Sequence, residues 1–458
     1  MSFVVHRLVI PIVFPDGISP GAGREGNRSI LSLNGCGKPV LRGSSIAGTL
    51  RHAWERVNSA SESSKWFGSP AGSDAREPSA LRVLDAILAA PDEERLHNSI
   101  DRHRGKVRER ALFSVSSLSA GVRTNLVMYL SSDASGLIVD QVQDFMNQIV
   151  SIVADGLPFG GNSARGVGRA SLTTDSKPKL RMFDLSDIEQ HGKWIDELRQ
   201  LAEKTPDSGT PITPQPLDSN RLQVSFKFAI APGQDVLVGG LNLDAVLEQQ
   251  QCTAADGTEY FRIPGSSMKG IFRSWFSRLA ARESLSVADN LHRLNRLLPH
   301  ESDKAADPGW GFVDEATRQK WISDPSLVTC PIMKLFGSLY AKGRFRCSDS
   351  RMKKGDLKSS HRTHVSIDRI SGGASEGFLF ESRVLAESPT SFEFSVTIDA
   401  PTEQEARWLH ATLTAIDLGV LRVGATKAAG RLQLSSKVNA VGEHAQIFAD
   451  LSAIGGIK

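Results

Sequence analysis

The chain has 458 residues, which is too long for one ordinary hydrophobic core and predicts two or three domains. Its hydrophobic fraction of 40% and charged fraction of 23% are typical of a globular protein and exclude the disordered and fibrous classes. The net charge of +3 is too small to indicate a nucleic-acid partner, so that interpretation depends on where arginine and lysine cluster along the chain.

Residues 1–14 alternate apolar and polar side chains and run into Pro15, Asp16 and Gly17, which predicts a first strand rather than a signal peptide. No window approaches the roughly 20 apolar residues that a membrane span requires. We therefore expect a cytoplasmic protein that makes no membrane contact. The four cysteines lie far apart without a CxxC pair, which predicts reduced, mostly buried thiols rather than a zinc site.

The next feature is a glycine turn between a strand and a helix, in VLRGSSIAGTLRHAW at residues 40–54. We expect a serine to cap this helix, so that the exposed amides at its start offer a place for an anion. The basic and hydroxyl side chains around this turn are the candidate contacts: Arg42, Ser44, Ser45 and Arg51. The alternative is an ordinary helix cap without a ligand.

A basic segment follows at residues 99–110, where SIDRHRG opens the run DRHRGKVRER with its five arginine or lysine residues. It would project as a cationic arm beside a pair of strands, with Arg102 and Arg104 as candidate contacts to a single-stranded nucleic acid. Such a run can also be only a solvated face.

The first half closes with a glycine loop, GGNSARGVGR at residues 160–169. Its glycines let the backbone approach a polyanion closely, and Arg165 and Arg169 supply cations. The loop follows a helix rather than a first strand and opens no Gly-Lys-Ser/Thr helix, so it is neither a dinucleotide fingerprint nor a P-loop. The alternative is a flexible turn.

The second half repeats these features in the same order. FRIPGSSMKGIFRSW at 261–275 repeats the glycine turn, SIDRISGG at 366–373 repeats the start of the basic segment, and LRVGATKAAGRLQL at 421–434 repeats the glycine loop. Coincidence is a poor explanation for this order. The corresponding candidate contacts are Ser266, Ser267, Lys269, Arg273, Arg369, Lys427 and Arg431.

The repeat sets the expected domain boundaries. We expect a first unit at 1–175, a helix and a Pro/Ser/Thr-rich linker at 176–218, and a second unit at 219–458 with a helical insertion at about 283–330. The expected helix before the linker has four apolar residues on one face, namely Ile188, Trp194, Leu198 and Leu201.

Each half has the order strand, loop, helix, strands, helix, glycine loop, strand. This βαββαβ order predicts an α+β protein made of two ferredoxin-like units, in which two helices cover one face of an antiparallel sheet. The second helix of each half is expected to end at a glycine, Gly156 or Gly419. Trp54 and Trp275 are expected to pack the first helix of each half onto its sheet.

Through IPGSSMKGIFR, SIDRISGGA and GGNSARGVGR, the chain resembles the RAMP superfamily of CRISPR-associated proteins, specifically the backbone subunits of type III effector complexes. The resemblance covers both halves and is strongest to the fused, tandem subunits of the type III-D variety. It implies a modified RNA-recognition-motif fold for each unit. It also implies that the Gly-Ser-Ser helices and glycine loops hold the backbone of a CRISPR guide RNA, while a thumb-like hairpin near each Ile-Asp-Arg segment distorts the guide–target duplex. The implied partners are the guide RNA, single-stranded target RNA, neighbouring backbone subunits and the large polymerase-like subunit.

The resemblance further implies metal-dependent cleavage of target RNA by an aspartate in the loop after the first strand. Aligning Pro15 with Pro232 without gaps sets Asn27 opposite Asp244. Only the carboxylate can hold Mg²⁺ or Mn²⁺ as an anion, orient the attacking 2′-hydroxyl or accept its proton. We therefore expect Asp244 to be the catalytic residue and the metal ligand, so that the second half cuts and the first half only binds.

Three alternatives stay open. Asp244 could be an ordinary loop carboxylate, with Asp16 and Asp235 as weaker catalytic candidates. The chain could be a non-catalytic scaffold for guide and target RNA. It could also be a guide-processing endoribonuclease with His52 or His103 as the general base.

Overall fold

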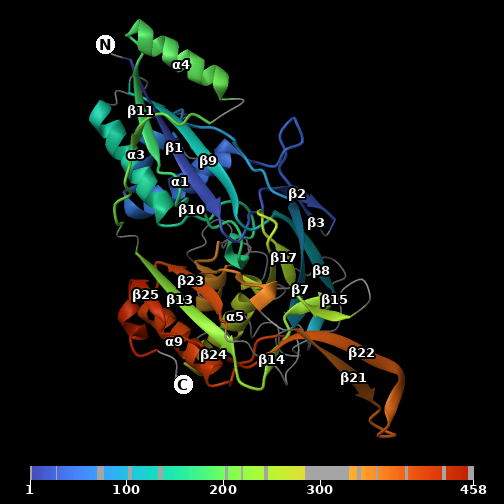
Figure 1. Cartoon of the computed structure of the whole chain (residues 1–458). Coiled ribbons are helices and arrows are strands. Elements are labelled where there is room, and N and C mark those ends of the chain that lie inside the picture. Colours follow the sequence, from blue (N-terminus) through green and yellow to red (C-terminus); the bar gives the residue numbers. More distant parts are fainter. Residues whose placement is uncertain are drawn as a thin grey trace, which may run out of the picture. The chain divides into compact units, whose positions relative to one another are not determined.

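The computed structural model describes the chain except for residues 1–2, 27, 70–76, 102–105, 133–137, 202–204, 218–219, 242–245, 284–329, 338–341, 357–358, 387–389, 425–429 and 452–458. The described residues form a mixed α+β protein with several sheets (Figure 1). They fall into two compact units, of which the first comprises Met1–Ser163, Val167–Ser219 and Thr253–Thr258 and the second comprises Ala164–Gly166, Asn220–Cys252 and Glu259–Lys458. The insertion predicted at about 283–330 lies, except at its edges, outside the described residues.

The first unit is built on an antiparallel sheet with β1 (Val4–Phe14) at its centre. Strand β9 (Val122–Ser131) pairs with one edge of β1, and β5 (Leu81–Val83) pairs with the outer edge of β9. The other edge of β1 pairs with β10 (Ser171–Leu172) and β11 (Lys179–Asp184). β1 is almost wholly buried because it has neighbours on both edges and side chains packed on both faces.

Two helices pack their apolar sides into the core of this sheet. α1 (Gly43–Val57) buries Ile46, Leu50 and Trp54, and α3 (Val139–Ala154) buries eight residues, among them Phe145 and Ile149. This spacing of three and four residues is the periodicity of an amphipathic helix. α2 (Ala60–Phe67) adds Trp66, whose ring stacks on Phe145 at a centroid distance of 4.2 Å.

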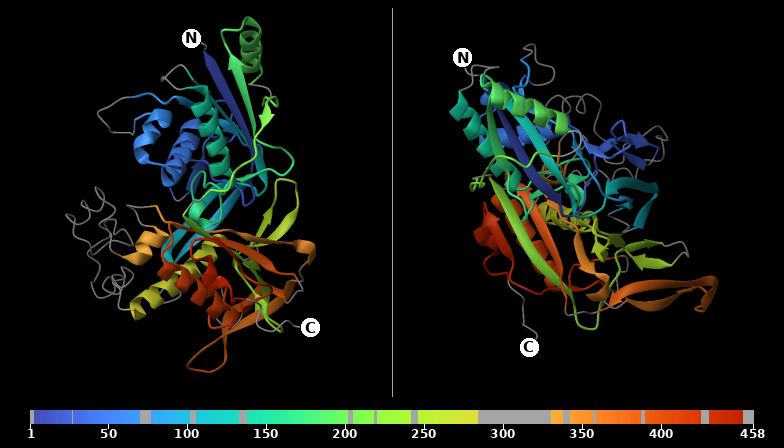
Figure 2. Two further views of the ribbon diagram at one scale, coloured as in Figure 1. Left: turned by 90° about the vertical axis from the view of Figure 1, so that its left-hand side faces the viewer. Right: turned by 45° about the horizontal axis from the view of Figure 1, so that its top comes forward.

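The segment predicted as a helix and linker contributes to the first sheet. The expected helix is present as α4 (Ile188–Gln200), but β11 before it and β12 (Thr210–Pro211) after it are strands that the sequence analysis did not predict. α4 lies beside β11 (Figure 2), and the ring of Trp194 is 4.9 Å from that of Tyr129. The predicted apolar face is partly wrong, because Ile188 is 90% exposed and Leu198 is 42% exposed.

The second unit repeats the strand order of the first. Its central strand β13 (Arg221–Ile230) pairs with β23 (Phe392–Asp399), and β19 (Phe345–Cys347) pairs with the outer edge of β23. The other edge of β13 pairs with β24 (Leu432–Leu434) and β25 (Asn439–Gly442). The orders β10-β1-β9-β5 and β24-β13-β23-β19 therefore correspond, and every pairing in them is antiparallel.

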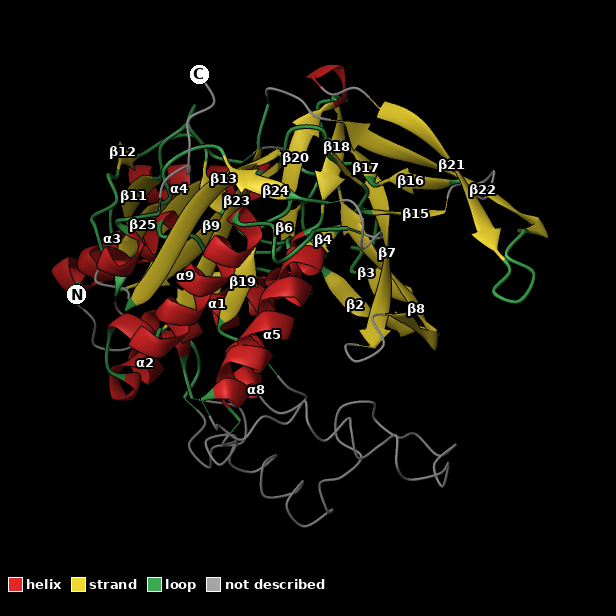
Figure 3. Cartoon of the chain, turned by 90° about the horizontal axis from the view of Figure 1, so that it is seen from below, coloured by secondary structure: helices red, strands yellow, loops and turns green. Residues whose placement is uncertain are grey.

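Helices α5 (Gly265–Arg282) and α9 (Glu403–Asp417) lie on one face of the β13–β23 sheet (Figure 3), and α8 (Pro331–Phe336) packs against α5. α5 buries Met268, Phe272 and Phe276 at the spacing seen in α1. The prediction for Trp275 is wrong, because Arg278 stacks over its half-buried ring at 5.6 Å. Phe276 takes the buried position that was expected for Trp275, because Phe276 follows Gly265 by as many residues as Trp54 follows Gly43. The neighbouring Trp275 is therefore turned away from the core.

A second sheet is also repeated. In the first unit the strand order of this sheet is β2-β3-β8-β7. The corresponding strand order in the second unit is β15-β16-β22-β21. The middle pairings, β3 with β8 and β16 with β22, are both parallel. The bounds of these strands are β2 (Gly21–Glu25), β3 (Arg28–Leu31), β7 (Asp92–Asp101), β8 (Lys106–Leu118), β15 (Gly239–Leu241), β16 (Leu247–Gln249), β21 (Ser359–Ile367) and β22 (Ala374–Ala386).

Short strands complete the two units. β4 pairs with β6, β18 pairs with both β17 and β20, and β14 pairs with one end of β22. Their bounds are β4 (Val40–Leu41), β6 (Ala86–Ile87), β14 (Asp235–Val236), β17 (Gln251–Thr253), β18 (Glu259–Ile263) and β20 (Ser350–Lys353).

Three smaller expectations can be checked. Gly156 and Gly419 follow the last turns of α3 and α9 with φ angles of +89° and +74°, so both glycine helix ends are confirmed. All four cysteines are free thiols, and all except Cys36 are buried. Among the described residues, no helix has the length and apolar character needed to cross a membrane.

Candidate nucleic-acid interface

The two Gly-Ser-Ser motifs form the first turns of corresponding helices. α1 begins at Gly43 after Arg42, and α5 begins at Gly265 after Pro264. The prediction that a serine caps each helix is wrong, because the serines lie inside the first turn, and neither helix has a side-chain capping bond from its N-cap residue within the described structure. Ser44 and Ser45 are exposed, and Ser266 and Ser267 are half-buried.

A carboxylate from elsewhere in the same unit accepts the first amide of each helix. The backbone N–H of Gly43 donates to Oδ1 of Asp85 at 2.7 Å, and that of Gly265 donates to Oδ1 of Asp349 at 2.8 Å. Each aspartate immediately precedes a strand that pairs with the strand leading into the helix. Neither residue is predicted from the sequence, because a helix N-terminus can be capped from a distant segment that no local motif reveals.

The glycine of each motif is required by a close approach of the backbone. A Cβ atom on Gly43 would lie 2.2 Å from the carbonyl oxygen of Val83, and one on Gly265 would lie 2.3 Å from that of Cys347. Both distances are far shorter than any real contact, so a larger residue would push the helix start away from the neighbouring strand. These glycines therefore serve packing within each unit.

Two predicted RNA contacts, Arg42 just before α1 and Arg51 within it, have partners inside the first unit. Arg42, whose side chain is 46% exposed, bonds Oδ2 of Asp85 at 3.0 Å and the carbonyl oxygen of Leu33 at 2.7 Å. Arg51 donates to Glu55, to the carbonyl oxygen of Gly68 and to Ser63.

The same contacts set the charge state of Glu55. Burial would raise the pKa of Glu55, but the hydrogen bonds from Ser63 and Arg51 lower it below its ordinary value. The guanidinium of Arg51 thus ties α1 to α2, and a contact between Arg51 and RNA stays a prediction.

Lys269, the single lysine of α5, has a strongly perturbed environment. Its Nζ donates to the carbonyl oxygen of Phe345 at 3.2 Å and lies 5.8 Å from the ring of Phe336. Burial, followed by the positive charges of Arg165 and Arg273, lowers the pKa of Lys269 to about 7. A lysine placed among other cations in this way would gain from a nearby anion.

A glycine of each glycine loop donates a backbone hydrogen bond to another segment of its own unit. The N–H of Gly168 donates to the carbonyl oxygen of Gly17, and that of Gly430 donates to the carbonyl oxygen of Asp235, each at 2.7 Å. Their φ angles of +81° and +88° favour glycine. Gly168 and Gly430 therefore hold corresponding places in the two loops, and the flexible-turn alternative stays open.

Arg169 and Arg431, which follow Gly168 and Gly430 in the sequence, each lie beside the C-terminal end of a helix. A Cβ atom on Gly156 would be 3.2 Å from Nε of Arg169, and one on Gly419 would be 2.8 Å from Nε of Arg431. Cations at this place stabilise the negative end of the dipoles of α3 and α9. Arg169 and Arg431 thus have a structural role, and RNA contacts by them stay predictions. Arg165, in the short 3₁₀ turn Ser163–Arg165, is exposed.

The Ile-Asp-Arg segments begin at the ends of matching strands, β7 and β21, and lead into the hairpin connections to β8 and β22. Arg369 is exposed in the second of these turns. Oδ1 of Asp368 accepts the amides of Ile370 at 2.9 Å and Ser371 at 2.7 Å, which orders the turn. These backbone bonds lower the pKa of Asp368. Arg102, Arg104 and Lys427 lie outside the described residues.

The predicted catalytic position also lies outside the described residues, as does its counterpart Asn27. Asn27 stands between β2 and β3, and Asp244 stands between β15 and β16, which are corresponding hairpins of the two repeated sheets. Of the weaker candidates, Asp16 and Asp235 are both buried, and Asp235 is engaged by Arg362 in an ion pair. No group of three or more potential metal ligands occurs among the residues that the structure describes.

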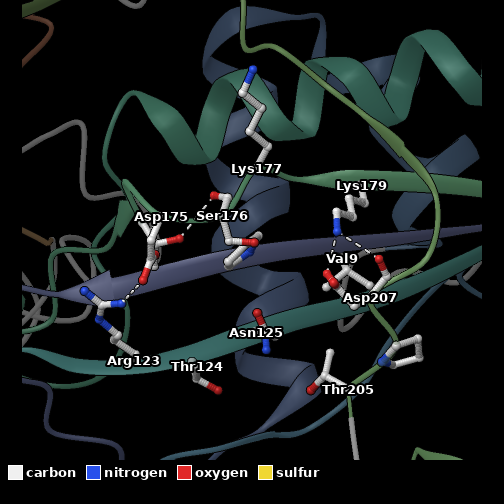
Figure 4. Close-up of a pocket in the computed structure, with 13 residues that line it drawn as sticks. Val9, Arg123, Thr124, Asn125, Asp175, Ser176, Lys177, Lys179, Thr205 and Asp207 are labelled. Atoms are coloured by element: carbon white, nitrogen blue, oxygen red, sulfur yellow. Dashed lines mark hydrogen bonds and ion pairs between the residues drawn. The ribbon is translucent and has the colours of Figure 1, made fainter.

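A cavity of about 520 Å³ lies in the first unit, apart from these motifs (Figure 4). Its lining includes an Arg123–Asp175 ion pair and Lys179, which donates to Asp207 at 2.6 Å. None of the predicted site residues lines it.

A model of the RAMP superfamily matches residues 9–171 and 252–431, which are most of the chain and fall in its two halves. The chain belongs to the RAMP superfamily. The search of curated proteins returned no match.

Among solved structures, this RAMP chain is similar to one from "Cryo-EM structure of the Type III-B Cmr-beta bound to cognate target RNA", at 14% identity and a TM-score of 0.30. The similarity covers 40% of this chain and 61% of the solved chain, so it spans about three fifths of that protein. At this TM-score the likeness supports no conclusion about fold or function.

Proposed function

We propose that the protein is a backbone subunit of a type III CRISPR interference complex that binds guide RNA along its two units. The observation that carries the proposal is the double match to the RAMP superfamily, which falls on the two halves that repeat the same strand order. The motifs of the sequence resemble the fused subunits of the type III-D variety, and we assign the chain to that variety as part of the proposal.

Each unit is proposed to be a ferredoxin-like module. The supporting observation is the fully antiparallel order β10-β1-β9-β5, repeated as β24-β13-β23-β19, with one helix after the first strand and another before the last. This is the arrangement expected when two helices cover one face of a four-stranded sheet. Two such modules in one chain would present two successive stretches of RNA-binding surface.

Guide contacts are proposed at the exposed parts of the repeated motifs. Ser44, Ser45, Arg165 and Arg369 are exposed, and Lys269 lies among cations whose charge an RNA phosphate would offset. Hydroxyl and basic side chains are the groups that bind a ribose-phosphate backbone without reading its sequence. Arg102, Arg104 and Lys427 would add charge from the segments outside the described residues.

Cleavage of target RNA is proposed for the second unit alone. Asp244 would orient or deprotonate the 2′-hydroxyl that attacks the adjacent phosphodiester, which Asn27 cannot do because an amide is not a base. A carboxylate oxygen together with RNA oxygens suits Mg²⁺ and Mn²⁺ equally, and such an ion would stabilise the charge that develops on the phosphate.

The proposal is tested by the RNA that accompanies the protein. We expect the native protein, isolated with its complex, to carry guide RNAs that contain CRISPR repeat sequence, identified by extraction and sequencing. Random fragments of cellular RNA, or no RNA at all, would overturn the assignment. If the isolated chain cut precursor guide RNA while metal was chelated, processing would replace interference as its function.

A further inference from the structure

The aspartates that accept the first helix amides are the strongest unassigned feature of the molecule. Neither Asp85 nor Asp349 belongs to a sequence motif singled out above, yet the two units place them identically. The bonds to Gly43 and Gly265, at 2.7 Å and 2.8 Å, are short for an N–H donor. This interaction is present in both halves of the repeat, and in each half it holds the start of the Gly-Ser-Ser turn.

Two contacts from the same strand segment hold each turn. Asp85 bonds the amide of Gly43, and the carbonyl oxygen of Val83, two residues earlier, leaves no room for a Cβ on that glycine. In the second unit Asp349 and Cys347 act on Gly265 in the same way. The hydrogen bond and the close carbonyl oxygen together fix the residue at which the helix begins and the rotation of its first turn.

The carboxylates also decide which groups of the turn remain for an RNA backbone. A negative charge at the first amide of a helix is stabilised by the helix dipole, and it repels a phosphate from that same amide. The groups left to contact RNA would be the serine hydroxyls that follow the glycine and the guanidinium of Arg42. Asp85 also orients Arg42, because Nη1 of Arg42 donates to Oδ2 of Asp85 at 3.0 Å. The placement of these groups depends on the rotation of the first turn.

We propose that Asp85 and Asp349 are positioning residues that hold the two Gly-Ser-Ser turns in the orientation that contacts the RNA backbone. The proposal rests on the RNA-binding function proposed above. It predicts that loss of the hydrogen bond weakens RNA binding even though neither carboxylate touches RNA. Asp85 is the better residue to test, because its side chain is 47% exposed, whereas that of Asp349 is 1% exposed beside Arg262.

The experiment measures the affinity of the full chain for a fluorescently labelled single-stranded RNA over a range of salt concentrations. Asp85→Ala should bind about tenfold more weakly, because one well-oriented charged hydrogen bond is worth roughly that factor. The slope of log K against log salt should fall by about one, because a phosphate contact is lost. Asp85→Asn keeps an acceptor oxygen for Gly43 but loses the ion pair with Arg42, so its affinity should lie between those of the wild type and Asp85→Ala.

The matched control is Asp187→Ala. Asp187 caps α4 by accepting the amides of Glu189 and Gln190, so this variant removes a helix cap of the same chemistry at a place without a Gly-Ser-Ser turn. It should leave both RNA affinity and salt slope unchanged. Thermal unfolding of every variant ensures that binding is measured on folded protein.

The outcomes separate the two proposals. If the wild-type chain does not bind RNA, the proposed function fails. If the wild type binds and Asp85→Ala binds with the same affinity and salt slope, the function stands and the positioning role is wrong. The positioning role is also wrong if Asp85→Asn is as weak as Asp85→Ala, or if Asp187→Ala weakens binding equally.

Discussion

Gly168 shows how a single residue of the glycine loop is fixed by its surroundings. Its φ angle is +81°, and a Cβ atom there would lie 2.1 Å from the carbonyl oxygen of Phe159. The corresponding Gly430 has φ +88° and would meet the carbonyl oxygen of Val423 at 1.9 Å. Both the backbone conformation and the space exclude a side chain, so these glycines are required by the fold of the loop itself.

Gly121 allows the effect of backbone conformation to be measured apart from the effect of limited space. Its φ angle is +82°, but no described atom lies within 4 Å of a Cβ placed on it. Gly121→Ala should therefore lose only the conformational advantage of glycine, about 1 kcal/mol of unfolding free energy. Gly168→Ala should lose about 3 kcal/mol or more, because the loop backbone must also move. Urea unfolding of both variants measures the difference, and equal losses would show that the close contact with Phe159 does not matter.

Lys269 makes stability depend on pH. Its pKa is lowered from 10.5 to about 7 in the folded protein, chiefly by burial. Between these two values the unfolded chain holds a proton that the folded chain has released, so Lys269 makes stability rise with pH across this window. Below about pH 7 both states are protonated, and the full penalty of burying the charge applies.

Lys269→Met should therefore stabilise the protein by about 4 kcal/mol near about pH 6 and by about 1 kcal/mol or less near about pH 10. Urea unfolding at the two pH values measures this. Lys334→Met, which replaces an exposed lysine of α8, is the control and should show no such difference. A stabilisation by Lys269→Met that is the same at both pH values would contradict the assigned environment.

At the scale of elements, a buried ion cluster joins three strands of the β13–β23 sheet in the second unit. Asp399 on β23 accepts Nε of Arg221 on β13 at 2.9 Å and is bound by Arg346 on β19, with one bond of 2.6 Å. All three side chains are at most 13% exposed. Removal of the carboxylate would leave two buried guanidinium groups without their shared partner.

Asp399→Ala should therefore cost about 3 kcal/mol of unfolding free energy, because breaking a buried ion pair leaves uncompensated charge. The control is Glu393→Ala. This variant breaks the exposed Lys227–Glu393 ion pair between β13 and β23 and should cost less than about 0.5 kcal/mol of unfolding free energy. Denaturant unfolding compares the two variants, and a loss for Asp399→Ala as small as that of the control would refute a stabilising role of the cluster.

At the scale of the whole molecule, the chain is a repeat whose two halves share strand order but differ at the proposed catalytic position. The hairpins that hold Asn27 and Asp244 occupy corresponding places in the two second sheets. The second half has the carboxylate of Asp244 where the first half has the amide of Asn27. This difference agrees with the proposal that both units bind RNA and only the second unit cuts it.

Asp244→Ala in the reconstituted complex should lower the rate of target-RNA cleavage about a hundredfold or more, as expected for loss of a general base or metal ligand. Asn27→Ala is the matched control and should leave the rate unchanged. Guide-RNA binding should be retained in both variants. If Asp244→Ala cuts the same positions at the same rate, the chain is a scaffold in that reaction and the cleavage assignment fails.

The sequence by itself determined the features that local chemistry controls. The repeat of three motifs indicated two similar halves, Trp54 was correctly expected to pack the first helix onto its sheet, and Gly156 and Gly419 marked two helix ends. These are predictable because helix periodicity and positive φ angles depend on neighbouring residues. The confusion of Trp275 with Phe276 arose where two large apolar residues are adjacent and only packing selects one.

Only the tertiary structure decided which partner each motif residue has. Asp85 and Asp349 cap helices that begin 42 residues before and 84 residues before them, respectively, and Arg51 and Arg431 bond or pack within their own units. β11 joins the first sheet although its residues follow the glycine loop. Such contacts depend on how distant segments meet in space, and a linear pattern does not record that.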